Sequence, residues 1–173
     1  MAQVIEDTAG KIRDLPIKPQ LKQLLLTAAQ AAGVDEVRVI SGGQCKIGTC
    51  PKRTGSPRHD DGNAADLKLI VGGHTLNFEN AADRQIFARF LSSAAAEGAT
   101  GIGAAANYMG PETAHVGYGL RAVWGAGGKS ANAPQWLIQA VQAGWGMPLV
   151  AGELKSIASL DSNDPEIEED SVD

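Results

Sequence analysis

Two segments of the sequence carry side chains whose types and spacing suit a metal centre. His59 is followed seven residues later by Asp66, and His115 stands three residues after Glu112. Imidazole nitrogens and carboxylate oxygens are the usual zinc ligands outside thiolate sites, and a catalytic zinc keeps three protein ligands and one water. We therefore predict His59, Asp66 and His115 as ligands, with Glu112 as a general base beside the bound water.

This prediction requires the chain to turn within each segment. An offset of seven cannot place His59 and Asp66 on one face of a straight strand, because only even offsets share a face. Gly62 and Asn63 suit a turn between them. The second pair, three residues apart, shares one side of a helical turn or a tight bend, and Pro111 suits the opening of such a turn.

Each segment also has an interpretation without function. A histidine in a surface loop is usually only solvated, and the sequence RHDD around His59 is compatible with a salt-bridged surface loop. Asp66 can serve as a turn or cap residue, and an isolated E-x-x-H occurs by chance. His74 lies in a predicted hairpin turn and is expected at the surface.

The elements around these segments are short and of mixed type. The hydrophobic spacing predicts helices over 19–32, from the N-cap Asn80 to Gly98, and over 134–144. Alternating or continuous apolar runs predict strands over 36–40, 64–71, 74–78, 102–106 and 114–118. Because helices and strands do not alternate strictly, we predict an α+β fold with a small antiparallel or mixed sheet packed with helices.

Composition places these elements in one domain with an acidic tail. The 173 residues have a formal charge of −5, but Asp161–Asp173 holds seven acidic and no basic residues. Residues 1–160 therefore carry 15 basic and 13 acidic side chains. We predict a single domain over 1–155 and an acidic, disordered tail over 156–173. A nearly neutral body without a basic patch does not predict nucleic acid as a partner.

Sequence features also bear on location and redox state. No stretch approaches the ~20 apolar residues that span a bilayer. The first residues lack the basic and apolar regions of a signal peptide, so we expect synthesis in the cytoplasm. Cys45 and Cys50 lie in a Gly-rich loop without C-x-x-C spacing, which leaves two alternatives open. They are free thiols in a cytosolic protein, or a loop disulfide in an oxidising compartment.

The combined motifs resemble a known family. The pattern H-x-x-G-x-A-x-D, followed about 50 residues later by E-x-x-H, is similar to the zinc D-alanyl-D-alanine carboxypeptidase family, with its vancomycin-resistance dipeptidases and phage L-alanyl-D-glutamate endolysins. The family shares its fold with the hedgehog signalling domain. The resemblance covers roughly residues 20–120, and its motif residues here are His59, Gly62, Ala64, Asp66, Glu112 and His115.

The resemblance implies a role for each matching residue. His59, Asp66 and His115 would hold zinc, and Glu112 would take a proton from the metal water and pass it to the leaving amine. Family members often have an arginine after the S-G that ends the strand, whereas Gln44 stands at that place here. In place of that arginine, we expect Gln44 and Arg58 to bind substrate and stabilise the oxyanion, with Arg53 as a further candidate.

These inferences lead to one expected function and two alternatives. The expected function is a zinc metallopeptidase that hydrolyses an amide bond in peptidoglycan stem peptides. It would be phage lytic or tail-associated, or an injected effector, and would reach the cell wall after release or injection. The first alternative is a non-catalytic zinc-stabilised binding module, since the fold can keep its metal for recognition. The second is a metal-free structural protein.

Overall fold

The computed structural model describes residues 1–147, so the predicted acidic tail at 156–173 lies outside the described residues. This part of the chain has an α+β fold with three α-helices and one seven-stranded mixed sheet, which confirms the predicted fold class. The helices are α1 (Pro19–Ala32), α2 (Ala81–Ala96) and α3 (Gln135–Gly144). The strands are β1 (Gln3–Glu6), β2 (Glu36–Ser41), β3 (Ala64–Val71), β4 (His74–Thr75), β5 (Gly101–Gly103), β6 (Ala114–Gly117) and β7 (Ala122–Trp124).

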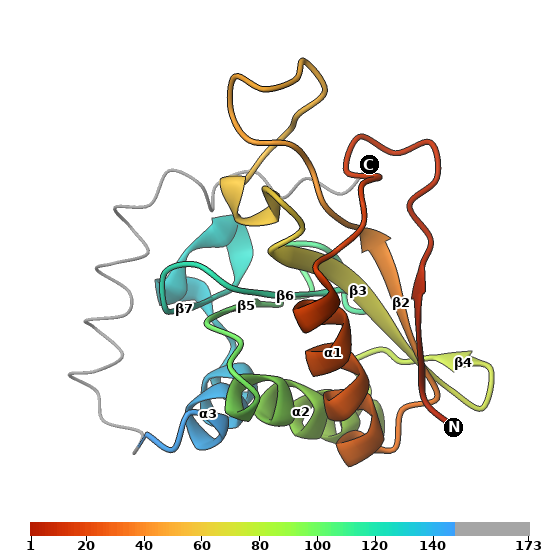
Figure 1. Cartoon of the computed structure of the whole chain (residues 1–173). Coiled ribbons are helices and arrows are strands. Elements are labelled where there is room, and N and C mark those ends of the chain that lie inside the picture. Colours follow the sequence, from red (N-terminus) through yellow and green to blue (C-terminus); the bar gives the residue numbers. More distant parts are fainter. Residues whose placement is uncertain (148–173) are drawn as a thin grey trace.

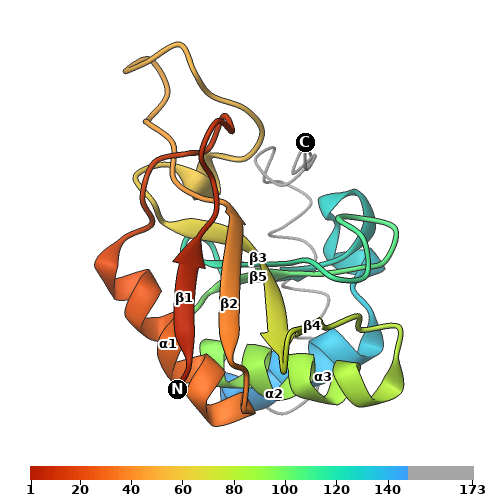
Figure 2. The ribbon, with the colours of Figure 1, turned by 90° about the vertical axis from the view of Figure 1, so that its right-hand side faces the viewer.

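The sheet has the order β1-β2-β3-β6-β5-β7, with β4 paired to β3 outside this path. The outer pairs β1–β2 and β5–β7 are parallel, and the pairs between them are antiparallel. Figure 2 shows β1 and β2 side by side at one edge of the sheet. The centre of the sheet therefore lies at β3 and β6, the two strands that carry Asp66 and His115.

The helices form beside the sheet because each presents an apolar face to the core. In α1 the predicted face of Leu21, Leu24, Leu25 and Ala28 is buried. The side chain of Asn80 caps α2 by accepting hydrogen bonds from the backbone N–H groups of Ala82 and Asp83. Helices α2 and α3 lie at the bottom of Figure 1, whereas the loop between β2 and β3 projects from the top.

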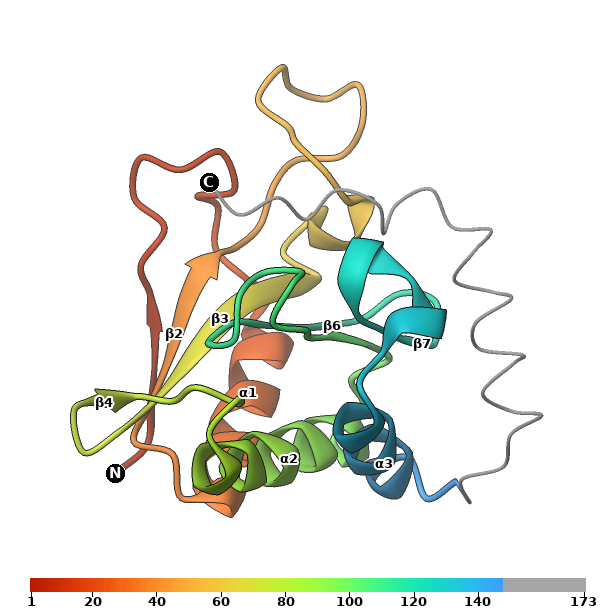
Figure 3. The same ribbon diagram turned by 180° about the vertical axis from the view of Figure 1, so that it is seen from behind.

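The structure corrects several predicted strands. The second hairpin strand contains only His74 and Thr75, and β5 occupies 101–103 rather than 102–106. The β3–β4 hairpin extends to one side in Figure 3. Strands β1 and β7 were not predicted from the sequence. Their four and three residues are too few for a clear pattern, and each becomes a strand by pairing in parallel with a distant segment.

The structure also bears on the cysteines and on membrane insertion. Cys45 and Cys50 form a disulfide rather than two free thiols. Among residues 1–147, no helix combines the length and the apolar character needed to cross a bilayer.

Candidate metal centre

Three elements bring the predicted ligands together. His59 ends the short 3₁₀ helix η1 (Pro57–His59), Asp66 lies in β3, and His115 lies in β6. Asp66 and His115 are direct partners in the antiparallel register of β3 and β6, so their side chains stand on the same face of the sheet. The tight bend expected between Glu112 and His115 is a turn that leads directly into β6, not a helical turn.

The three side chains are buried and close together. His59 and His115 have no exposed surface, and Asp66 is 1% exposed. Asp66 Oδ1 lies 3.0 Å from His115 Nδ1, and Asp66 Oδ2 lies 3.5 Å from His59 Nε2. One donor atom from each residue falls within 4.8 Å of the others. Two imidazoles and one carboxylate in this arrangement could hold a metal ion.

Burial also decides between the interpretations of these residues. A solvated surface histidine is excluded for His59, and Asp66 lies inside a central strand rather than at a turn or cap. The salt-bridged surface loop expected from RHDD applies to the two residues after His59, because Asp60 pairs with Arg53 and Asp61 pairs with Lys46.

Backbone contacts orient His59 for metal binding. Its Nδ1 lies 2.9 Å from the carbonyl oxygen of Gly42. Because a carbonyl only accepts, Nδ1 is the donor in this contact, and Nε2, the nitrogen that faces Asp66, is the atom that could bind a metal. The predicted turn forms at Gly62, whose φ is 75° and where a Cβ would lie 2.6 Å from the carbonyl oxygen of Pro16. Glycine is therefore required in this motif for both conformation and space.

Two glycines of β5 make room for the packing behind His115. A Cβ at Gly103 would collide with the indole of Trp124, and one at Gly101 would collide with the guanidinium of Arg58. Trp124 is fully buried and packs 4.9 Å from the ring of His115, measured between ring centroids. This contact restricts the orientation of the His115 ring.

Arg13 is a site residue that the sequence did not indicate. It is 3% exposed, and its Nη1 lies 3.4 Å from Asp66 Oδ2 and 3.3 Å from the hydroxyl of Ser41. Its Nη2 donates to the carbonyl oxygen of Thr54 at 3.0 Å. The local pattern around Arg13 resembles any charged loop, so only the tertiary structure reveals a buried guanidinium beside a candidate ligand.

Glu112 lies at the outer side of the cluster. Its carboxylate accepts a hydrogen bond from Lys68 at 2.9 Å, and its side chain is 40% exposed. Lys68 follows Asp66 by two residues in β3, so both point to the same face of the sheet. Glu112 is therefore on the same side of the sheet as the three candidate ligands. For Glu112 to act in catalysis, its carboxylate must either keep the ion pair with Lys68 while it reacts or leave that pair.

The predicted substrate-binding residues serve the protein's own structure. Arg58 is buried, donates to the carbonyl oxygens of Tyr118 at 3.1 Å and Leu120 at 2.9 Å, and stacks on Trp124. Gln44 is 1% exposed, and both ends of its amide bond to groups of the 44–60 loop. These contacts favour structural roles for Arg58 and Gln44 over the predicted contact with substrate.

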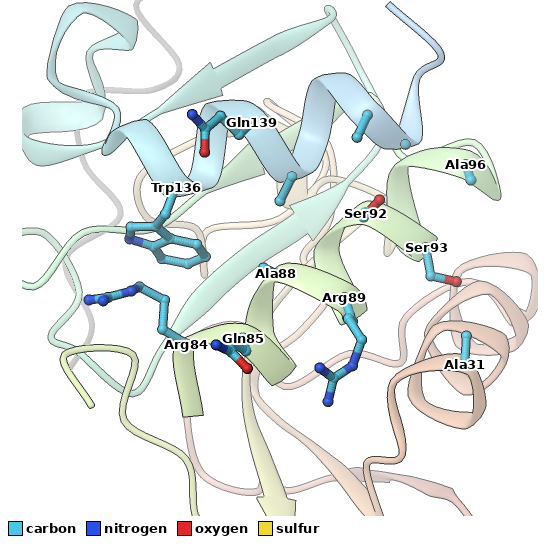
Figure 4. Close-up of a pocket in the computed structure, with 13 residues that line it drawn as sticks. Ala31, Arg84, Gln85, Ala88, Arg89, Ser92, Ser93, Ala96, Trp136 and Gln139 are labelled. Carbon is cyan, nitrogen blue, oxygen red and sulfur yellow. The ribbon is translucent and has the colours of Figure 1, made fainter. Parts of the chain in front are cut away.

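A separate groove lies on the helices, away from these ligands. It has a volume of about 740 Å³ and runs between α2 and α3, where Trp136 and Arg84 face each other (Figure 4). None of the three candidate ligands lines it. Its walls are largely small side chains, and nothing in its composition resembles the donor set of the metal centre.

Comparison of the chain with protein-family models, with curated proteins and with solved structures finds no match. A fold alone does not imply a function, because one architecture can carry many unrelated sites. The residues and the geometry of the candidate metal centre are therefore the basis for assigning a function to this chain.

Proposed function

We propose that this protein is a zinc-dependent peptidase that hydrolyses an amide bond in peptidoglycan stem peptides. The observation that carries the proposal is the buried cluster of His59, Asp66 and His115, with one donor atom of each within 4.8 Å of the others. The resemblance of the two motifs to the zinc D-alanyl-D-alanine carboxypeptidase family supports zinc as the metal and a cell-wall peptide as the substrate.

The donor set is of the kind that catalytic zinc uses. Three protein ligands of the His and Asp type leave one position for water or substrate. A zinc ion held there would polarise the scissile carbonyl and make a water molecule more acidic. The contact of His59 Nδ1 with Gly42 supports this assignment, because catalytic ligand histidines are usually held by a bond from their second nitrogen.

Glu112 is the proposed proton carrier. Its carboxylate takes a proton from the attacking water, whose oxygen bonds to the carbonyl carbon. It returns that proton to the amide nitrogen as the carbon–nitrogen bond breaks. Its exposure of 40% and its place on the ligand side of the sheet support contact with substrate. Lys68 donates a hydrogen bond to this carboxylate at 2.9 Å.

Arg13 is the proposed source of positive charge beside the candidate ligand Asp66. Its guanidinium is 3% exposed and bonds to Ser41 and Thr54, so it would act on the site through its charge rather than by touching substrate. Arginine is always protonated at neutral pH, and it binds anionic oxygens through fixed N–H groups. The guanidinium contacts Asp66 and Ser41, the residue that ends β2 in the S-G sequence. An arginine from another part of the chain thus lies close to the place where the family resemblance implies one.

Digestion of purified murein tests the proposal. The zinc-loaded protein should release stem-peptide fragments that mass spectrometry identifies. Glu112→Gln should lower the turnover at least about 100-fold, because general base catalysis contributes roughly 10²–10⁴-fold. It should still bind one zinc per chain. Glu97→Gln is the matched control, since Glu97 is exposed and lies at the C-terminal end of α2. Full activity of Glu112→Gln would show that the mechanism is wrong.

The ion pair of Glu112 with Lys68 favours a second candidate, a non-catalytic zinc-stabilised binding module. In such a module the pair would be a permanent structural contact. One zinc per chain without any murein cleavage, and the same affinity for murein in Glu112→Gln, would support the module over the peptidase.

A further inference from the structure

We propose that the disulfide-closed loop of residues 45–55 positions His59 and Asp66. The affinity of the centre for metal would then depend on the Arg53–Asp60 ion pair and on the Cys45–Cys50 disulfide. The inference rests on the metal site of the proposed function but does not depend on hydrolysis. The loop projects from the end of the molecule opposite α2 and α3 (Figure 1).

The loop begins in direct contact with the backbone of His59. The Gln44 N–H donates to the carbonyl oxygen of His59 at 3.1 Å, and the Asp61 N–H donates to the carbonyl oxygen of Gln44 at 2.8 Å. Two residues earlier, Gly42 accepts the bond from His59 Nδ1. The segment 42–44 therefore holds both the ring and the backbone of this ligand.

Arg53 and Asp60 close the loop onto this segment. Arg53 Nε donates to the carbonyl oxygen of Cys45 at 2.7 Å, and Arg53 Nη2 forms an ion pair with Asp60 Oδ1. The same Asp60 oxygen accepts from Gln44 Nε2 at 3.1 Å. Asp60 follows His59 directly in sequence. The position of His59 is therefore coupled, through the Arg53–Asp60 ion pair, to the part of the loop that carries Arg53. We refer to Gln44, Arg53 and Asp60 as the polar network of the loop.

The loop also reaches the second ligand. Thr54 accepts a hydrogen bond from Arg13, and the same guanidinium contacts Asp66 at 3.4 Å. Thr54 is held in turn by Gln44, whose Oε1 accepts from the Thr54 N–H at 3.1 Å. Two of the three candidate ligands are thus connected to one loop through side chains that are buried or half-buried.

The disulfide closes residues 45–50, the first half of this loop. Cys45 is adjacent to Gln44 and supplies the carbonyl that Arg53 bonds, whereas Cys50 lies three residues before Arg53. Reduction of the disulfide takes two electrons and two protons and gives two thiols. The open loop then has more conformations available, and each bond of the polar network costs more entropy to form. Loss of outer contacts of this kind typically weakens metal binding roughly 10–100-fold.

Two substitutions at neighbouring positions distinguish an effect of the polar network from a general effect of changing a basic residue in the loop. Arg53→Met removes the ion pair with Asp60, whereas Lys52→Met removes only the exposed pair with Asp14. Zinc affinity is measured by competition with a chelating dye, and cobalt substitution reports the coordination geometry by its visible absorption. We expect Arg53→Met to raise the Kd for zinc roughly tenfold. Lys52→Met should leave the Kd within about twofold, as an exposed pair contributes little.

A second set of measurements tests whether the disulfide contributes to zinc affinity. The oxidised wild type is compared with the Cys45→Ser/Cys50→Ser variant, which cannot bind zinc through released thiols. It is also compared with wild type treated with the phosphine TCEP, which takes up oxygen from water as it reduces the bond. Both forms should bind zinc more weakly than the oxidised protein, by roughly three- to tenfold. The variant that combines Arg53→Met with both serine substitutions should have a Kd close to that of Arg53→Met alone, because both changes act through the same contacts.

The outcomes distinguish this inference from the proposed function. If the wild type binds no zinc, the metal site itself is wrong. If the wild type binds zinc tightly and all variants match it, the metal site stands and the positioning role of the loop is overturned. Purely additive effects of Arg53→Met and the serine substitutions would overturn the link between the disulfide and the polar network.

Discussion

At the scale of single residues, Asp66 balances the charge of the candidate metal centre. It is buried, and it contacts both histidines and the guanidinium of Arg13. A buried guanidinium is tolerated only when an opposite charge and hydrogen bonds compensate for the lost water. We therefore expect Asp66 to stabilise the fold in addition to its proposed role in metal binding, and the two roles can be separated by experiment.

We expect Asp66→Ala to destabilise the metal-free protein by about 3–5 kcal/mol, because it leaves Arg13 buried without its carboxylate. The double variant Asp66→Ala/Arg13→Met should recover part of this loss, since it removes the uncompensated charge. Urea unfolding in the presence of a chelator measures both. Asp14→Ala, which breaks the exposed pair with Lys52, serves as the control and should change stability by less than about 1 kcal/mol. An Asp66→Ala variant as stable as wild type would contradict the expected charge balance.

At the scale of elements, the start of α2 joins the β3–β4 hairpin to the helical layer. Asp83 lies in the first turn of α2, and its carboxylate accepts from the Asn77 N–H at 3.0 Å and contacts His74 Nε2 at 2.9 Å. His74 is exposed, as expected from the sequence, and its partner belongs to a helix cap rather than to a metal site. Burial raises the pKa of Asp83, but the bonds from Asn77 and His74 outweigh burial and leave the pKa below its usual value.

This direction predicts how stability depends on pH. An aspartate whose pKa is lowered by folding stabilises the protein above its unfolded pKa of about 3.9, and the contribution is lost as pH falls through the lower folded pKa. Asp83→Asn should therefore cost about 1 kcal/mol at pH 7, and the difference from wild type should shrink below about pH 4. Urea titrations at several pH values test this. Exposed Glu79→Gln is the control, and a difference that grows on acidification would exclude the assignment.

At the scale of the whole molecule, the candidate metal centre joins parts of the chain that are far apart in sequence. The ligands come from η1, β3 and β6, and Arg13 comes from the segment between β1 and α1. Such a site forms only when the sheet is complete. Metal binding at this site would therefore be thermodynamically linked to folding.

Removal of the metal should lower the melting temperature. A ligand at about 100 times its Kd stabilises the native state by about 2.7 kcal/mol. For a domain of this size that free energy corresponds to a shift of about 5–10 °C. Scanning fluorimetry with zinc and then with excess EDTA measures the shift. His59→Ala should show little response, and an equal shift in His59→Ala would place the metal elsewhere.

Local physics explains why much of the fold could be predicted from sequence. The periodic apolar residues of α1 and the continuous apolar run of β3 specify helix and strand by themselves, and both were predicted with the bounds that the structure has. The motif residues His59, Asp66 and His115 could be grouped for a similar reason. All three carry side chains of the types that bind zinc, and Gly62 marks the turn that brings two of them together.

The remaining features depend on contacts between distant segments. Strands β1 and β7 exist because they pair with β2 and β5, and no short sequence encodes a partner. Arg13 is buried, and Gln44 and Arg58 donate hydrogen bonds to backbone carbonyls. These contacts likewise depend on which distant segments pack together. The sequence thus determined the donor types and the local elements, because these follow from side-chain chemistry and hydrophobic periodicity. Only the tertiary structure decided which charges face the donors, because burial and long-range pairing are properties of the complete packed chain.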